Sequence, residues 1–211
     1  EEQIQVTVAA HHNLLQESRL YTADCTLENS REITELLESY EIPLYISGHL
    51  HAQRIKRHKE EPGEAPGTYN ISEIVLSPYA LPPCQYGLLS WNESDDMEFV
   101  TRRVPVSEYA RERGNEDAFL LEFDRRGPEF VKEIIREQVM KKIDSVPDDL
   151  KEKMARLYSE LYFDFCHGNR LRGDEVKSTK AYRLWERVAP DSRYVAEMRA
   201  MMADVSTELH D

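Results

Sequence analysis

The sequence predicts an α+β protein with a β-rich N-terminal part followed by an all-helical module. Two observations indicate this fold class. Short apolar runs of strand character, bounded by turn residues, occupy the chain up to residue 106. From residue 107 onward, apolar residues recur at helical spacing and strand signals are few. We therefore expect two domains, residues 1–106 and 107–211.

The N-terminal part begins with a predicted strand, helix and strand. Residues 4–8 alternate between apolar and polar side chains, which is typical of a strand with one buried face. A helix is expected over residues 29–40, with Asn29 or Ser30 as its cap and a stripe formed by Ile33, Leu36, Leu37 and Tyr40. Residues 43–48 then predict a second buried strand. Histidines follow both strands, so we expect them to meet at one edge of a sheet.

Three further strands and four helices complete the predicted fold. The strands are expected at residues 69–76, 86–91 and 97–106, after a turn-rich segment at 59–67. Pro128 favours the first turn of a helix whose apolar face continues to residue 143. Further helices are predicted at residues 145–165, 174–188 and 192–205, and Gly168 is a natural stop after the first of them.

Composition excludes several classes of function. The 27 basic and 40 acidic residues give a net charge of −13, which disfavours a broad nucleic-acid surface. No run approaches the roughly 18 apolar residues of a transmembrane helix, and neither a signal nor an anchor is visible. We expect a soluble chain and leave its compartment open, because an upstream targeting sequence would not be seen. Cys25, Cys84 and Cys166 are too far apart to predict a disulfide framework.

The histidine motifs indicate metal chemistry. His11-His12-Asn13 follows the first predicted strand, and Gly48-His49-Leu50-His51 follows the second. In a His-x-His at a strand end, the two histidines project to the same side, and Leu50 should face into the fold. Imidazole nitrogen suits zinc, iron and manganese alike. The simpler interpretation is a set of solvated or hydrogen-bonded histidines.

In this context the two motifs resemble the later metal-binding blocks of the calcineurin-like metallophosphoesterases. Those blocks are a histidine, often within His-His, followed by Gly-His-x-His. The resemblance covers about residues 3–106 and implies the C-terminal part of a metallophosphoesterase α/β sandwich. The strands predicted near residues 74–76 and 86–89 resemble the pair that follows the Gly-His-x-His block.

The resemblance implies a role for each histidine. His11 and His49 would bind one metal ion, His51 would bind a second, and His12 would act in catalysis by contacting the substrate or the leaving group. The cofactors would be two divalent or trivalent ions of manganese, iron or zinc. The substrate would be a phosphate ester, either a cyclic nucleotide or another phosphodiester, attacked by a metal-activated water.

The earlier blocks of that family, Asp-x-His, Gly-Asp and Gly-Asn-His, have no match in this sequence. Gly173-Asp174 is better explained as a helix cap, and Gly114-Asn115 is followed by Glu116. We therefore expect a C-terminal fragment of a metal-dependent phosphoesterase that is inactive alone, or a chain completed by another subunit. The strand at residues 4–8 would then leave an open surface, which predicts a homodimer.

A second hypothesis is a non-catalytic helical module that binds a partner, with histidines that are relics or hold a structural metal. Other conspicuous residues have simpler explanations. The basic run at residues 54–59 is expected to be a solvated face. Cys166-His167 and the aromatic residues at 158–165 are expected to be structural, and Asp24 and Glu28 are expected to be ordinary loop residues.

Overall fold

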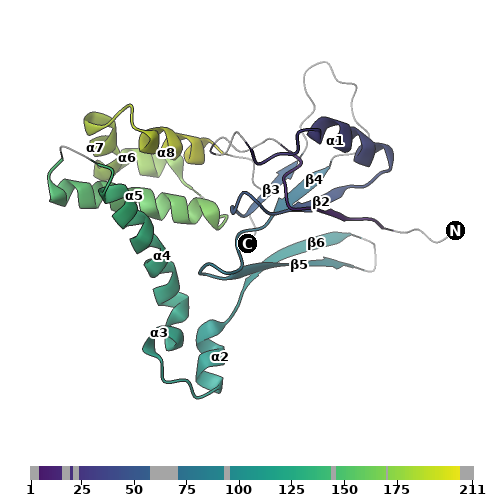
Figure 1. Ribbon diagram of the computed structural model, residues 1–211, viewed down its shortest axis with the longest axis horizontal. Coiled ribbons are helices and arrows are strands. Elements are labelled where there is room, and N and C mark those ends of the chain that lie inside the picture. Colours follow the sequence, from purple (N-terminus) through teal and green to yellow (C-terminus); the bar gives the residue numbers. More distant parts are fainter. Residues whose placement is uncertain are drawn as a thin grey trace. The chain divides into compact units, whose positions relative to one another are not determined.

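The computed structural model describes residues 5–15, 20, 24–57, 71–92, 96–143, 146–169 and 171–204. These residues form two compact units. The first unit extends to Ser77, and the second runs from Pro78 to Ala203. Helices and strands are mixed, so the predicted α+β class is confirmed (Figure 1). The domain boundary predicted between residues 106 and 107 stays a prediction.

The first unit is built around a mixed four-stranded sheet in the order β1-β2-β4-β3. Strand β2 pairs in parallel with both β1 and β4, whereas β3 pairs antiparallel with β4. The predicted strand–helix–strand order is confirmed and its two strands are parallel, but the first strand covers Val8–Ala9 instead of residues 4–8. The elements are β1 (Val8–Ala9), α1 (Ser30–Ser39), β2 (Leu44–Ser47), β3 (Arg54–Arg57) and β4 (Ser72–Val75).

Helix α1 contributes a narrower apolar face to this core than its sequence predicts. Leu37 is buried and Ile33 is partly buried, whereas Leu36 and Tyr40 are 54% and 71% exposed. Only the side of the helix that carries Ile33 and Leu37 packs against the core cluster, and the helix ends at Ser39, before Tyr40. One buried cluster of this core is formed by Leu14, Leu15, Leu37, Tyr45 and Ile71.

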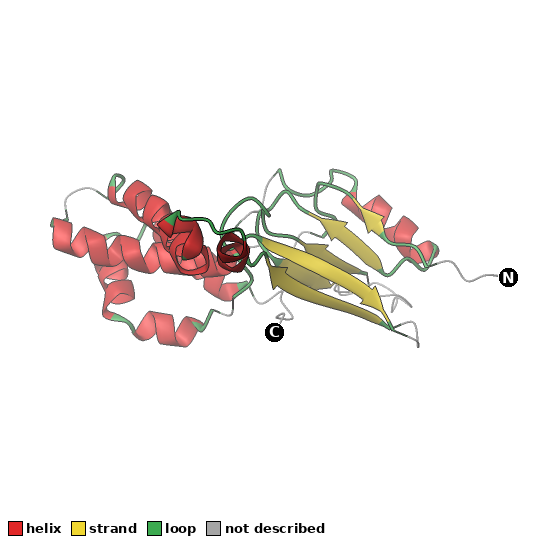
Figure 2. Ribbon diagram, turned by 90° about the horizontal axis from the view of Figure 1, so that it is seen from below, coloured by secondary structure: helices red, strands yellow, loops and turns green. Residues whose placement is uncertain are grey.

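The second unit combines a β-hairpin with helices (Figure 2). Strands β5 (Gln85–Trp91) and β6 (Met97–Arg103) pair only with each other among the described strands. The expected pairing of strands near residues 74–76 and 86–89 is therefore not observed, because β4 pairs with β2 and β3. The helices are α2 (Val106–Glu112), α3 (Ala118–Leu121), α4 (Phe123–Met140), α5 (Asp148–Cys166), α6 (Gly173–Ser178), α7 (Lys180–Val188) and α8 (Arg193–Ala203).

Helix α5 is central to the packing of the second unit. It lies against α4, α7 and α8 and buries the side chains of Met154, Tyr158, Leu161 and Phe165. The indole Nε1–H of Trp185, on α7, donates a 2.8 Å hydrogen bond to the Met154 carbonyl. Because Trp185 is fully buried, this hydrogen bond fixes α7 against α5.

Two helix boundaries differ from the sequence prediction. Pro128 lies inside α4 rather than at its start, since α4 begins at Phe123. Gly127 precedes it, and a Cβ there would lie 2.9 Å from the Pro82 side chain, so only glycine fits without a shift. The helix expected over residues 174–188 is divided at Thr179, whose extended backbone and side-chain hydroxyl cap α7.

No helix among the residues in the described ranges is long and apolar enough to cross a membrane.

Candidate functional site

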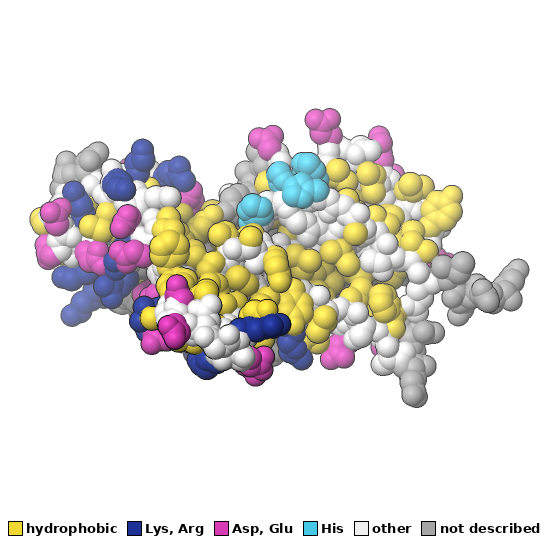
Figure 3. Space-filling model, turned by 60° about the horizontal axis from the view of Figure 1, so that its bottom comes forward, with side chains coloured by type: hydrophobic (Ala, Val, Ile, Leu, Met, Phe, Trp, Pro, Cys, Tyr) yellow, Lys and Arg dark blue, Asp and Glu magenta, His cyan; other side chains and the backbone are white. Residues whose placement is uncertain are grey.

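The sheet ladder of the first unit brings the two histidine motifs together. Ala10 N–H donates to the Ile46 carbonyl at 3.0 Å, and Gly48 N–H donates to the His11 carbonyl at 3.1 Å. Backbone hydrogen bonds between the two segments therefore continue beyond the ends of β1 and β2, as far as His11 and Gly48. The expectation that histidines of the two motifs meet at one edge of the sheet is confirmed for His11, His12 and His49, whose rings are in contact. Figure 3 shows histidine side chains gathered on the surface of the molecule.

Three histidine rings form the cluster. The centroids of His11 and His49 are 5.0 Å apart in an edge-to-face arrangement, and His12 stacks on His49 at 4.5 Å. His11 and His12 are exposed, and His49 is half-buried. His49 Nδ1 lies 3.0 Å from His11 Nε2. The cluster therefore presents one close pair of ring nitrogens to solvent.

The hydrogen bonds of His49 assign its tautomer in the neutral state. His49 Nε2 lies 3.1 Å from the carbonyl oxygen of Asp24, which can only accept, so Nε2 carries the proton. His49 Nδ1 then has a free lone pair and accepts a hydrogen bond from His11 Nε2–H. A metal-ligating histidine needs the same arrangement, with one nitrogen held by a carbonyl and the other available.

The backbone around this cluster is unusual. Asp24, His49 and His51 all have left-handed φ values, of 60°, 53° and 52°. Such conformations are uncommon outside glycine, and they concentrate at functional sites where neighbouring structure enforces them. Three of them in two adjacent loops indicate that the loops are shaped to place these side chains.

The same backbone changes the explanation of the His-x-His motif. The prediction assumed an extended strand end, in which His49 and His51 would project together. Because both residues are left-handed, that alternation does not apply, and the ring contacts of the cluster join His49 to His11 and His12. His51 is exposed, while Leu50 is buried as expected. A larger residue would fit at Gly48, because a Cβ at this position would make only ordinary van der Waals contacts.

Asn13 anchors the first histidine loop. Its backbone N–H donates to the Cys25 carbonyl and its own carbonyl accepts from Leu27 N–H, both at 2.9 Å. The hydroxyl of the buried Tyr45 donates to the His12 carbonyl at 3.0 Å. The segment that carries His11 and His12 is therefore held on both sides by hydrogen bonds to described residues.

A buried carboxylate completes this anchor. Glu73, on β4, is fully buried and accepts hydrogen bonds from Asn13 Nδ2, Ser47 Oγ and the N–H groups of Leu14 and Leu15. The distances lie between 2.5 and 3.0 Å. Sequence analysis did not single out Glu73. Its signal was an acidic residue next to the apolar residues Ile74 and Val75 in a predicted strand, which indicates a buried charge with dedicated partners.

The charge partner of Glu73 corrects a prediction. The basic run was expected to be a solvated face, but Arg54 is 5% exposed and Lys56 is 1% exposed. Lys56 Nζ lies 3.7 Å from Glu73 Oε2 and donates to the Leu15 carbonyl at 2.7 Å. These side chains belong to strand β3. The strand was not predicted from the sequence, because three of its four residues are Lys or Arg, which are rarely buried. His58 and Lys59 lie outside the described residues.

The histidine cluster does not by itself supply a full set of metal ligands among the described residues. Across the described ranges, no group of three or more His, Cys, Asp or Glu side chains is arranged to hold a metal ion. His11 and His49 supply one pair of nitrogens, and the ring of His12 stacks on that of His49. Burial raises the pKa of the nearby Cys25 thiol, which disfavours the thiolate that a metal would need.

Most residues with simpler explanations lie as expected, but Gly173 and Asp174 do not cap α6, because its N-cap is Arg172 and no side chain caps it. His167 follows the last residue of α5, Cys166, and is 6% exposed. Gly168 adopts a φ of 74° and ends that helix. Gly173 and Asp174 begin α6. Tyr158, Phe163 and Phe165 are buried in the second unit.

Comparison with protein families gives a match to the second unit. Residues 105–208, just under half of the chain, match the model of the C-terminal domain of cyclic nucleotide phosphodiesterase. The match begins at the start of α2 and includes all the later helices. Comparison with curated protein sequences gave no significant match.

This match corrects the resemblance drawn from the histidine motifs. The family found is the C-terminal domain of cyclic nucleotide phosphodiesterase and not the calcineurin-like metallophosphoesterases, so that assignment is wrong. The first unit is therefore no longer interpreted as part of a calcineurin-like metallophosphoesterase sandwich. The physical reason is that a short His-x-His motif depends only on the local course of the chain. Many different folds contain such a segment, so the motif alone does not identify a family.

Proposed function

We propose that this chain takes part in the hydrolysis of a phosphodiester, with its histidine cluster as a metal-binding site. The substrate class is suggested by the name of the matched domain, which is that of a cyclic nucleotide phosphodiesterase. A cyclic nucleotide or another phosphodiester would fit this chemistry. The proposal for the site depends on the first unit, whereas the proposal for the substrate depends on the second.

The observation that carries the proposal is the pair formed by His11 and His49. Their facing nitrogens are 3.0 Å apart. Two imidazole nitrogens bound to one tetrahedral zinc ion, at about 2.0–2.1 Å each, would be about 3.3 Å apart. A metal ion could therefore replace the shared proton with little movement of either ring. The Asp24 carbonyl already holds the outer nitrogen of His49.

We assign the histidines as follows. His11 and His49 would bind one ion and His51 would contribute to a second, the ions being manganese, iron or zinc. When bound, such ions polarise the phosphoryl group and supply a hydroxide nucleophile at neutral pH. His12, which is exposed beside the pair, would orient the phosphate and protonate the departing oxygen. Further donors are required, because the described residues do not gather three ligands.

Metal binding by the chain tests this proposal. The wild-type chain should bind Mn²⁺ or Zn²⁺ in equilibrium dialysis. His11→Ala and His49→Ala should each weaken binding by at least about 10–100-fold, the loss that follows removal of a residue that only supports a ligand. Glu32→Gln, which changes an exposed acid on α1, is the matched control and should bind as the wild type does. Equal binding by wild type, both histidine variants and the control would contradict the metal site.

Turnover of an aryl phosphodiester, measured on the same samples, separates metal binding from catalysis. We expect little turnover by this chain alone even with metal bound, because the ligand set is incomplete among the described residues. Metal-dependent turnover that disappears in His12→Ala would show that the chain is a working catalyst. Turnover that is unchanged in His11→Ala and His49→Ala would remove the catalytic role of the cluster.

The alternative is a non-catalytic module that binds a partner through its helices. The lack of a three-ligand group among the described side chains favours it. Under this alternative the His11–His49 pair is a hydrogen bond that joins two loops. Replacing both residues would then change loop stability without changing any metal affinity.

A further inference from the structure

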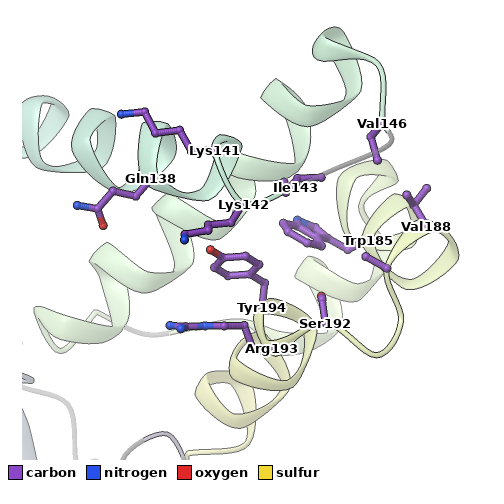
Figure 4. Close-up of a pocket in the computed structure, with 11 residues that line it drawn as sticks. Gln138, Lys141, Lys142, Ile143, Val146, Trp185, Val188, Ser192, Arg193 and Tyr194 are labelled. Carbon is purple, nitrogen blue, oxygen red and sulfur yellow. The ribbon is translucent and has the colours of Figure 1, made fainter.

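The second unit contains a pocket that lies apart from the histidines in the sequence and has a different chemistry. It has a volume of about 670 Å³ and lies between α4, α7 and the start of α8 (Figure 4). This volume is within the range of about 300–1,000 Å³ that is typical of small-molecule sites. The residues that line it are Gln138, Lys141, Lys142, Ile143, Val146, Trp185, Val188, Ala189, Ser192, Arg193 and Tyr194.

The charge of the pocket is opposite to that of the chain. Its lining contains Lys141, Lys142 and Arg193 and no acidic side chain, although the net charge of the chain is −13. Lys141 lies 4.0 Å from Glu137, and Arg193 lies 3.1 Å from Glu197, so acids outside the lining partly neutralise both. Lys142 forms no ion pair with any residue that the structure describes. An anion in the pocket would therefore gain most from Lys142.

The base of the pocket is apolar and aromatic. Trp185 is fully buried beneath it, while Val188 is 40% exposed and Tyr194 is half-buried. The Tyr194 ring packs against Trp185 at 5.5 Å, and the Arg193 guanidinium lies 5.5 Å from its centroid. In Figure 4 the side chains of Lys142 and Arg193 lie on either side of Tyr194, whereas Lys141 points away from it. The lining thus offers an apolar surface flanked by two cations.

We propose that this pocket binds a small organic anion that carries a flat ring. The ring would pack on Tyr194 and Val188, and the anionic group would lie between Lys142 and Arg193, with Ser192 available as a hydrogen-bond donor. A nucleoside monophosphate and an aromatic carboxylate share this chemistry. The inference is independent of the proposed metal site, because every lining residue belongs to the second unit.

Calorimetric titration of the full chain tests the proposal with four probes. Adenosine monophosphate and benzoate carry both a ring and a charge, adenosine carries only the ring, and ribose 5-phosphate carries only the charge. At least one of the first two should bind, and adenosine and ribose 5-phosphate should bind at least about tenfold more weakly. Binding of adenosine monophosphate alone would identify a nucleotide site, and binding of benzoate alone would identify a carboxylate site. Failure of both to bind would overturn the proposal.

Substitutions of single residues test whether the ligand binds in this pocket. Lys142→Ala should weaken the affinity of the ligand that binds by about tenfold, which corresponds to the loss of one charge-assisted hydrogen bond. Arg187→Ala is the matched control, because Arg187 is an exposed cation on α7 that does not line the pocket. Circular dichroism would verify that both variants fold. Unchanged affinity in Lys142→Ala, or an equal loss in Arg187→Ala, would overturn the proposal.

Fluorescence gives a second and independent localisation. The chain has two tryptophans, Trp91 on β5 and Trp185 beneath the pocket. In the Trp91→Phe background, the emission of Trp185 should change with the same midpoint as the calorimetric titration. Binding that leaves the emission of Trp185 unchanged would place the ligand elsewhere and contradict the proposed site.

Discussion

The histidine cluster of the first unit and the pocket of the second unit are built from different kinds of structure. The cluster lies on loops that include left-handed residues, and the loop that carries His11 and His12 is fixed by hydrogen bonds from Leu14 and Leu15 to a buried carboxylate. The pocket lies between regular helices, above a packed aromatic base. Loop geometry in the first unit therefore depends on a few polar contacts, whereas geometry in the second unit depends on the packing of many side chains.

This difference determines how each site should respond to substitution. Removing one partner of a buried charged network leaves the other partner without compensation, so the loss is large and local. Replacing a buried aromatic side chain by another one in the helical core keeps most apolar contacts and leaves one backbone carbonyl without its hydrogen bond, so the loss is smaller. The three predictions below test this contrast, from the largest expected effect to the smallest.

Replacement of Glu73 should have the largest effect. Glu73→Ala removes the carboxylate that lies 3.7 Å from the buried Lys56 and the acceptor for Leu14 and Leu15 N–H. We expect a loss of about 3–5 kcal/mol in the free energy of unfolding of the first unit. Hydrogen exchange followed by mass spectrometry should show faster exchange at residues 10–15 and 71–77, with unchanged protection in the second unit.

Two further variants make the Glu73 result interpretable. Glu32→Ala removes an exposed acid on α1 and should change the free energy of unfolding by no more than about 0.5 kcal/mol. Glu73→Gln retains an acceptor oxygen, and it can be measured if Glu73→Ala does not fold. Normal protection at residues 10–15 in Glu73→Gln and in Glu73→Ala would show that the network does not hold the histidine loop.

Replacement of Trp185 by phenylalanine should have an intermediate effect on the second unit. The Met154 carbonyl would lose the hydrogen bond from the indole N–H and remain buried. We expect a loss of about 1–3 kcal/mol in the free energy of unfolding, measured by urea denaturation with circular dichroism. The matched control is Trp91→Phe, since Trp91 is 43% exposed. An equal loss in both variants would show that the buried hydrogen bond is not the cause.

A change in pH should have the smallest effect, because it involves one proton on one buried ring. Burial lowers the pKa of His167, whose Nδ1–H donates to the Phe163 carbonyl at 2.7 Å. A histidine in the unfolded chain titrates near pH 6.5, so the unfolded state binds the proton first as the pH falls. Neutral His167 therefore makes its full contribution to the free energy of unfolding above about pH 6.5. This contribution is lost as the pH falls through the folded-state pKa.

Urea denaturation of the wild type and of His167→Gln, between neutral pH and about pH 5, measures this effect. The wild type should lose stability of the second unit over this interval, and the variant should lose less. The same acid-dependent loss in both proteins would show that other groups cause it.

Much of the fold followed from local patterns. The limits of α1 and α5 and the parallel β1–β2 arrangement were predicted because helical periodicity, caps and buried apolar runs are encoded by neighbouring residues. Strand β3 was missed because its polar residues are buried only through partners far along the chain, as Lys56 is by Glu73. The wrong family assignment has the same origin, since the motif was interpreted without its backbone conformation.

By itself, the sequence determined the α+β class, the helical periodicity of the second unit and the meeting of the two histidine motifs at one sheet edge. Only the tertiary structure decided which ring nitrogens face each other, which charges are buried and where the pocket lies. Periodicity determines secondary structure through contacts within a few residues. Left-handed loops, buried ion pairs and cavities arise from contacts between distant segments, and no local pattern encodes them.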